Sequence, residues 1–210
     1  MRISLKGKRV LITAGPTWVP IDPVRVISNT ATGETGTLLA QICRRSGANV
    51  TLLLGPAAAS CPDSKVKVIR FTFFNELRSI LFRELASHKY QFLIHAAAVS
   101  DYGPQKLSGK KIVSGIKRLD LKLKPTPKLI DAVKKISKGV YLVGFKFEPD
   151  AAGGTLIKKA RDMMHRSCAD IVVANTVRGN RYQAYIVGEE AVEGPIKNKR
   201  RLAERLIKRL

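Results

Sequence analysis

Short runs of apolar residues, many of them β-branched, alternate along the chain with segments whose apolar residues recur every three or four positions. Arg9–Thr13 (RVLIT) predicts a buried strand that ends in the turn Gly15-Pro16. The apolar residues between Leu38 and Cys43 share one helical face, and Gly47 is expected to end that helix. This alternation is typical of an α/β fold with a mainly parallel sheet.

The same patterns predict the remaining elements. Leucines spaced four residues apart mark two helices, at Leu77–Leu85 and at Leu202–Leu210. Alternating polarity predicts a hairpin between residues 182–187 and 191–196. Further strands are expected at residues 49–54, 65–71, 92–96, 140–145 and 171–174, and further helices at residues 127–136 and 155–166.

The pattern is weaker in the middle of the chain. Residues 103–118 are rich in Gly, Ser and Lys and have little apolar periodicity, so they predict a mobile loop. Leu119, Leu121 and Leu123 then alternate with polar residues, and this alternation predicts a half-buried strand.

No internal repeat or linker interrupts residues 1–210, so we expect one domain. Its predicted architecture is α/β: a Rossmann-like, open and mainly parallel sheet with helices on both faces and a small β-hairpin extension. Ligands of such sheets bind outside the carboxyl ends of the strands. Four of the predicted strand ends carry polar or small residues suited to a nucleotide-sized cleft: 15–17, 96–101, 144–145 and 174–175.

Composition narrows the class of protein. The chain is 45% hydrophobic, and no window approaches the roughly 18 consecutive apolar residues that a membrane helix needs. The basic and apolar N-terminal run is too short for a signal peptide, so we expect a cytoplasmic protein without a membrane contact. The three cysteines are scattered and lack C-x-x-C spacing, and the histidines form no ligand pattern, so no metal site is predicted.

Charge is the unusual property. Lys and Arg number 38 against 16 acidic residues, a net charge of +22, which attracts nucleic acid or small phosphorylated substrates. The basic residues are spread along the chain, without a zinc finger or an aromatic RNA-binding motif. Nucleic acid is therefore an unlikely partner, and a basic nucleic-acid-binding module stays an alternative interpretation.

The connection after the first strand is long. A dinucleotide-binding protein would have a compact G-x-G-x-x-G turn at this place. It places Asn29–Gly33 at a predicted helix N-terminus, where free N–H groups favour an anion. Arg25 lies four residues upstream and offers a charge-assisted contact. The alternative is that Asn29, Thr30 and Thr32 only cap the helix, and spacing alone does not separate the two.

These residues resemble a known family. Gly15-Pro16-Thr17, Pro20–Asn29, Thr32-Gly33 and Gly36 are similar to the signature of phosphopantothenoylcysteine synthetases, also called phosphopantothenate–cysteine ligases. The resemblance covers nearly the whole chain in matching order and spacing. Many relatives carry a flavin-dependent decarboxylase domain before this one, so the chain resembles the stand-alone ligase. The resemblance continues through residues 96–102, 111–112, 119–130, 143–148 and 170–175.

The resemblance implies a ligase of coenzyme A biosynthesis. Such enzymes activate 4'-phosphopantothenate with a nucleoside triphosphate, CTP in bacterial relatives and ATP in several others. An acyl-nucleotide and pyrophosphate form, and the amine of L-cysteine then displaces the nucleotide. The resemblance also implies Mg²⁺ and a homodimer, for which the 182–196 hairpin is a candidate surface. A Rossmann-like nucleotide-binding reductase is the other alternative, although Leu54-Gly55-Pro56 replaces the acidic residue expected after its second strand.

The resemblance also assigns roles. Asn29 would hold the acyl-nucleotide, Arg25 would contact the anionic substrate, and Thr32 and Gly33 would complete the substrate site. Lys111, or its neighbour Lys110, would neutralise charge that develops on phosphate. The residues expected to line the nucleotide site are His95, Ala96, Ala97, Asp101, Pro127, Lys128, Leu129, Ile130 and Phe145.

Each assignment has a structural alternative. The loop lysines could be solvated charges, Asp101 a turn cap, Phe145 a core residue and His95 a buried structural residue. Some positions also depart from the family. Glu34 stands where relatives often have a basic residue. Met163 and Ser167 stand where bacterial relatives have nucleotide-binding lysines, with Arg161 or Arg166 as possible substitutes.

Overall fold

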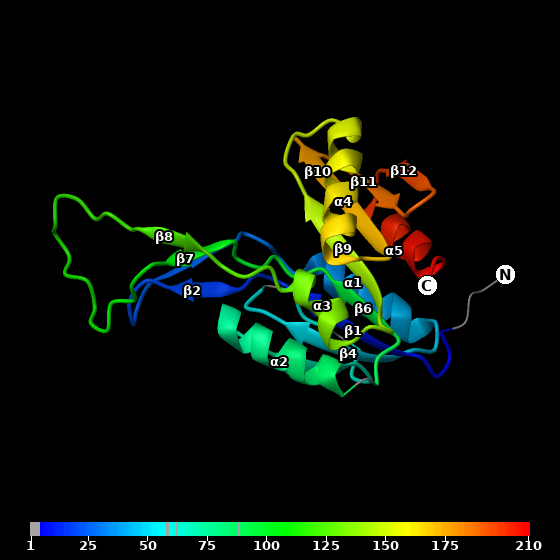
Figure 1. The fold of residues 1–210 in the computed structure, drawn as a ribbon, viewed down its shortest axis with the longest axis horizontal. Helices are drawn as coiled ribbons and strands as arrows, with labels where there is room; N and C mark the ends of the chain where they lie inside the picture. Colours follow the sequence, from blue (N-terminus) through cyan, green and yellow to red (C-terminus); the bar gives the residue numbers. More distant parts are fainter. Residues whose placement is uncertain (1–4, 58, 62, 88) are drawn as a thin grey trace.

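The computed structural model describes residues 5–210 except 58, 62 and 88. Its centre is an eight-stranded sheet (Figure 1). The strands are β1 (Arg9–Ala14), β4 (Asn49–Leu54), β5 (Lys67–Arg70), β6 (Phe92–His95), β9 (Tyr141–Phe147), β10 (Ile171–Arg178), β11 (Arg181–Val187) and β12 (Val192–Ile196). They lie in the order β12-β11-β10-β9-β6-β1-β4-β5, and all neighbours from β10 to β5 pair in parallel. The predicted α/β architecture is thus confirmed.

Helices cover both faces of this sheet (Figure 1). On β1, Val10 and Ile12 belong to one apolar cluster and Leu11 to the other, because successive side chains point to opposite faces. Burial on both faces explains why the central strands are continuous apolar runs. One face is covered by α1 (Glu34–Arg45) and α5 (Lys199–Ile207), and the other by α2 (Phe74–Ala86), α3 (Ile130–Ile136) and α4 (Gly153–Ser167).

The predicted hairpin is present at one edge of the sheet. Strands β10 and β11 pair antiparallel from Val172 with Val187 to Arg178 with Arg181, and β12 pairs with β11. Gly179 adopts a left-handed φ of 55° in the tight turn between β10 and β11. The antiparallel partner extends β10 well beyond its predicted end at residue 174. Within the described residues, no helix is long and apolar enough to span a bilayer.

Two small antiparallel ribbons form an extension that we call the arm, residues 18–28 and 102–125, which projects from the sheet (Figure 1). One ribbon joins β2 (Trp18–Pro20) to β3 (Val26–Ser28), and the other joins β7 (Tyr102–Pro104) to β8 (Leu123–Pro125). The half-buried strand predicted across Leu119, Leu121 and Leu123 is wrong. These leucines are 46%, 40% and 46% exposed, because this part of the arm has no apolar core to pack against.

Helix α1 lies unusually close to the first strand. A Cβ atom at Gly36 would lie 2.4 Å from the Cβ atom of Ala14 on β1, so only glycine permits this approach. Helix α1 ends as predicted at a left-handed glycine, since Gly47 has a φ of 92°. The close contact fixes the N-terminus of α1 against the carboxyl end of β1.

We expect Gly36→Ala to lower the free energy of unfolding by about 1–3 kcal/mol, because the added methyl group overpacks the contact with Ala14. Gly154→Ala is the matched control, since Gly154 is also helical but has open space around its Cβ position. That variant should be neutral or stabilising by up to about 1 kcal/mol. Urea denaturation checks both, and an equally stable Gly36→Ala protein would contradict the assigned close contact.

Candidate functional site

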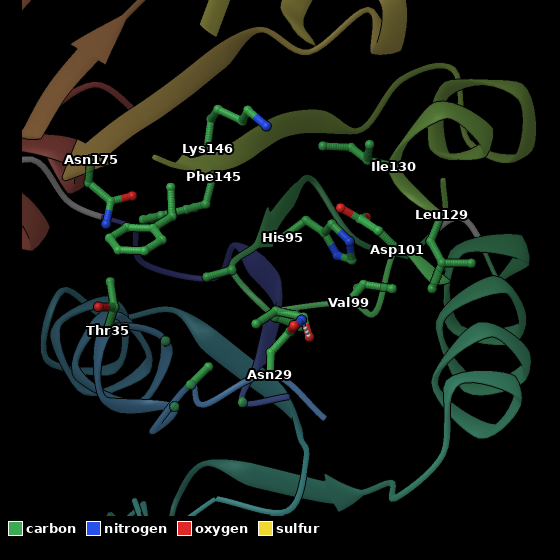
Figure 2. A pocket seen from close by; sticks show the side chains of 18 of the residues that line it. Asn29, Thr35, His95, Val99, Asp101, Leu129, Ile130, Phe145, Lys146 and Asn175 are labelled. Carbon is green, nitrogen blue, oxygen red and sulfur yellow. Dashed lines mark hydrogen bonds between the residues drawn. The ribbon is translucent and has the colours of Figure 1, made fainter. Parts of the chain in front are cut away.

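A cavity of about 650 Å³ opens at the carboxyl ends of the central strands (Figure 2). Three connections meet there, the one after β1, the one after β6 and the one that leads into α3, together with the ends of strands β9 and β10. Figure 2 shows Thr35, Phe145 and Asn175 toward one side of the cavity, and Val99, Asp101 and Leu129 toward the other. The structure therefore brings the four predicted strand ends into one site.

Most of the predicted site residues line this cavity. Arg25 and Lys111 are not among the lining residues. The predicted residues that do line it are Asn29, Thr32, Gly33, His95, Ala96, Ala97, Asp101, Pro127, Lys128, Leu129, Ile130 and Phe145.

Two buried hydroxyls join the connections after β1 and β6. The backbone N–H of Ser100 donates to Thr17 Oγ1 at 2.9 Å, and Ser100 Oγ donates to the Thr17 carbonyl at 3.0 Å. Asn29 continues this network, because its Nδ2 atom donates to the carbonyl of Ala98 at 3.0 Å. These bonds hold one wall of the cavity in a fixed shape.

The N-terminus of α1 forms another part of the wall. Its N-cap is Gly33, which has a left-handed φ of 78° and no side-chain cap. Thr32 Oγ1 lies 3.4 Å from the N–H of Glu34, a long contact, and the amide of Asn29 is directed to Ala98. Residues 33–36 line the cavity, so the first turn of α1, which has free N–H groups suited to an anion, borders it.

His95 ends β6 in a buried position on the cavity wall. Its Nδ1 atom lies 2.9 Å from Thr13 Oγ1, and that hydroxyl also accepts the N–H of Ala97 at 3.1 Å. Burial lowers the pKa of His95 to about 4, so the imidazole is neutral at neutral pH. This environment suits a residue that shapes the connection after β6 more than a proton donor.

Each cationic side chain in the described lining is paired with a carboxylate. Lys128 bonds Asp101 at 2.5 Å, and Arg166 bonds Asp131 at 3.0 Å. The other two pairs are Lys146 with Glu148 and Lys199 with Glu34. The four cations of the described lining are thus balanced by four carboxylates, and the excess positive charge that would attract an anionic ligand is that of the whole chain, +22.

The two predicted residues outside the cavity lining belong to the arm. Arg25 Nη1 donates to Asp22 Oδ2 at 2.5 Å and to the Ile112 carbonyl at 3.2 Å, while the Ile112 N–H donates to Asp22 Oδ2 at 3.0 Å. The Ile112 N–H, together with further hydrogen bonds, holds the pKa of the buried Asp22 carboxyl well below its usual value. Asp22 and Arg25 thus hold the segment that contains Lys111.

The positions on α4 that depart from the family pattern lie at or next to the cavity. Met163 lines the cavity, and the buried Ser167 donates its hydroxyl to the Met163 carbonyl at 2.7 Å. Arg166 lines the cavity from the same helix, whereas Arg161 is not among the lining residues.

Sequence reasoning missed several lining residues, notably Lys146, Tyr182 and Lys199. Lys146 directly follows Phe145 at a predicted strand end and could have been inferred. Tyr182 and Lys199 lie far along the chain from the first connection, and no motif marks them.

Few protein groups suit a metal ion. No group of three His, Cys, Asp or Glu side chains within the described parts of the chain could hold one. The carboxylates of the described cavity lining are Glu34 and Asp101. Such a donor set fits a Mg²⁺ ion that is bound largely by substrate phosphates and water, as is usual for this ion.

Comparison with known proteins shows the family and the fold. Residues 5–210 match the family described as DNA/pantothenate metabolism flavoprotein C-terminal domain. The coenzyme A biosynthesis bifunctional protein CoaBC of Thermococcus kodakarensis is 41% identical over 207 residues, which are 97% of this chain and 51% of that protein. The chain thus spans about half the length of the curated relatives it matches.

Solved structures share the fold. The DNA/pantothenate metabolism flavoprotein from Streptococcus pneumoniae superposes with a TM-score of 0.87 at 27% identity, covering 97% of this chain and 98% of that one. A Cab2 mutant in complex with phosphopantothenate-cysteine has a TM-score of 0.77 at 23% identity, covering 96% and 86%, a likeness of fold alone. The match across residues 5–210 means that the chain belongs to the family of the DNA/pantothenate metabolism flavoprotein C-terminal domain.

Proposed function

We propose that this chain is a phosphopantothenate–cysteine ligase of coenzyme A biosynthesis. The observation that carries the proposal is the cavity at the carboxyl edge of the sheet. It gathers every residue that the ligase signature assigns to the nucleotide site except Lys111, on a chain that belongs to the matching family. The high sequence similarity to a protein of coenzyme A biosynthesis supports the same pathway.

The first chemical step activates a carboxylate. A carboxylate oxygen of 4'-phosphopantothenate attacks the α-phosphorus of the nucleoside triphosphate, an O–P bond forms, and the bond to the bridging oxygen breaks to release pyrophosphate. In the second step the amine of L-cysteine attacks the acyl carbon, the nucleoside monophosphate leaves, and the amine loses a proton. Both steps depend mainly on positioning and on charge neutralisation around phosphates.

The cavity supplies these two requirements. Asn29, whose amide donates to the Ala98 carbonyl, would orient the acyl-nucleotide, and the N-terminus of α1 beside Thr32 and Gly33 would bind an anionic group. The neutral His95 keeps the connection after β6 in shape. Phe145 offers a half-buried aromatic wall beside Asn175 (Figure 2).

Arg25 is assigned to bind the anionic substrate, and Lys111 is assigned to neutralise the charge that develops on phosphate. Asp22 and Arg25 both contact Ile112, the residue next to Lys111. These contacts couple Arg25 to Lys111, so a movement of the arm would bring both residues to the site together. Mg²⁺ would reach the site with the triphosphate, and the 60% exposed side chain of Asp101 could serve as a protein ligand if it shares its charge between the ion and Lys128. The ion would stabilise negative charge on the phosphates.

The assembly and location belong to the same proposal. We expect a homodimer, whose interface would cover exposed apolar residues. More of these residues lie on the arm than on the 182–196 hairpin, where Val192 is exposed. The exposed large apolar residues of the arm are Val24, Val26, Tyr102, Leu107, Val113, Ile116, Leu119, Leu121 and Leu123. The three cysteines are free, as is usual for a protein of the reducing cytoplasm.

The decisive assay incubates the chain with phosphopantothenate, L-cysteine and Mg²⁺, with CTP and ATP in separate reactions. Pyrophosphate should form with at least one nucleotide, and its release should require phosphopantothenate because the carboxylate is the attacking group. The ratio of kcat/KM values for CTP and ATP would assign the nucleotide. Absence of pyrophosphate with both nucleotides would refute the proposed function.

Asn29→Asp should lower kcat/KM about 100-fold, because a carboxylate cannot donate to the Ala98 carbonyl and repels an anionic substrate. Asn49→Asp is the matched control, since Asn49 is exposed at the start of β4 and lies outside the cavity lining. Steady-state kinetics of both variants checks the prediction. Turnover of Asn29→Asp equal to that of the control would show that Asn29 has only a structural role.

A further inference from the structure

An ion pair joins helix α1 to helix α5 at the lining of the cavity. Glu34 lies in the first turn of α1, Lys199 lies in the first turn of α5, and their side chains form a hydrogen-bonded ion pair. Both residues line the cavity. The position of Lys199 is well defined, because Asn198 caps α5 by accepting the N–H groups of Arg200 and Arg201 at 2.8 and 3.1 Å.

The charge of Glu34 acts on the cavity wall. Burial, with an added effect of the Glu34 carboxylate, raises the pKa of the Tyr182 hydroxyl, and Tyr182 also lines the cavity. In the described residues, the hydroxyl of Tyr182 has no hydrogen-bond partner. Among the residues that the structure describes, Lys199 is the cation that pairs with Glu34.

A carboxylate at this position opposes the proposed ligand. A nucleoside triphosphate carries several negative charges, and an unpaired carboxylate in the cavity lining would repel them, to an extent that solvent moderates because the Glu34 side chain is 59% exposed. The other lining carboxylate, Asp101, is neutralised by Lys128 in the same way. Lys199 therefore determines whether Glu34 adds a net negative charge to the site.

We propose that Lys199 is a positioning residue that neutralises Glu34 and thereby lets the cavity accept an anionic nucleotide. This inference rests on the proposed ligase function. It extends the functional site to the C-terminal helix, because α5 contributes the cation that the first turn of α1 lacks. It also explains how an acidic residue is tolerated at the N-terminus of α1 beside an anion site.

The test compares wild type with Lys199→Met by steady-state kinetics, with the nucleotide varied and the other substrates saturating. The nucleotide KM should rise about tenfold, with kcat changed less than about threefold, because an uncompensated charge weakens binding. Arg200→Met is the matched control. Arg200 is the next residue of α5 and forms an exposed pair with Glu204 at 3.2 Å outside the cavity lining, so its KM should equal that of wild type.

Rescue separates charge neutralisation from packing. The double variant Glu34→Gln/Lys199→Met should return to within about twofold of the wild-type KM, because both the charge and its partner are gone. An unchanged KM in Lys199→Met, or a double variant as impaired as the single one, would overturn the inference. Should Lys199→Met fail to fold, Glu34→Gln alone serves, and it should equal or lower the wild-type KM; a tenfold rise would refute the proposal.

Failure of the inference is distinguishable from failure of the proposed function. A wild-type protein that releases no pyrophosphate would refute the ligase function. An active wild type whose nucleotide KM is insensitive to Lys199→Met would refute only the role of Lys199.

Discussion

The parallel register of the central strands is the constraint on which the rest of the molecule depends. Because β1, β6, β9 and β10 run in one direction, their carboxyl ends meet at one edge and their connections share one cavity. The contact of Gly36 with Ala14 sets α1 against the end of β1, and the bonds between Thr17 and Ser100 close the neighbouring wall. The positions of Asn29, His95 and Phe145 follow from this arrangement.

The parts of the fold that were predictable are those buried on both faces of the sheet. A strand such as β4 must be apolar at nearly every position, and α1 must have an apolar stripe and a glycine at its end, so their boundaries are visible in the sequence. The cavity lining was predictable for the same reason, since parallel strand ends converge. The family signature then assigned 12 of the 29 described lining residues to the site by number.

The remaining features depend on contacts that sequence pattern does not encode. Leu119, Leu121 and Leu123 alternate like a half-buried strand, but alternation does not reveal that the arm has no core beneath it. Asp22 lies in the family signature, but only the fold shows that it accepts the backbone N–H of Ile112. Lys199 is 165 residues from Glu34, and no local signal predicts their meeting.

Charge placement gives the cavity its chemical character. The described cations of its lining are each paired with a carboxylate, and its wall includes a neutral imidazole in place of a strong base. Hydrogen–deuterium exchange tests the central claim that this cavity holds the nucleotide and the phosphopantothenate. With both bound and cysteine omitted, protection should concentrate in residues 29–36, 95–101 and 126–130. Protection confined to other surfaces, or none, would contradict the account.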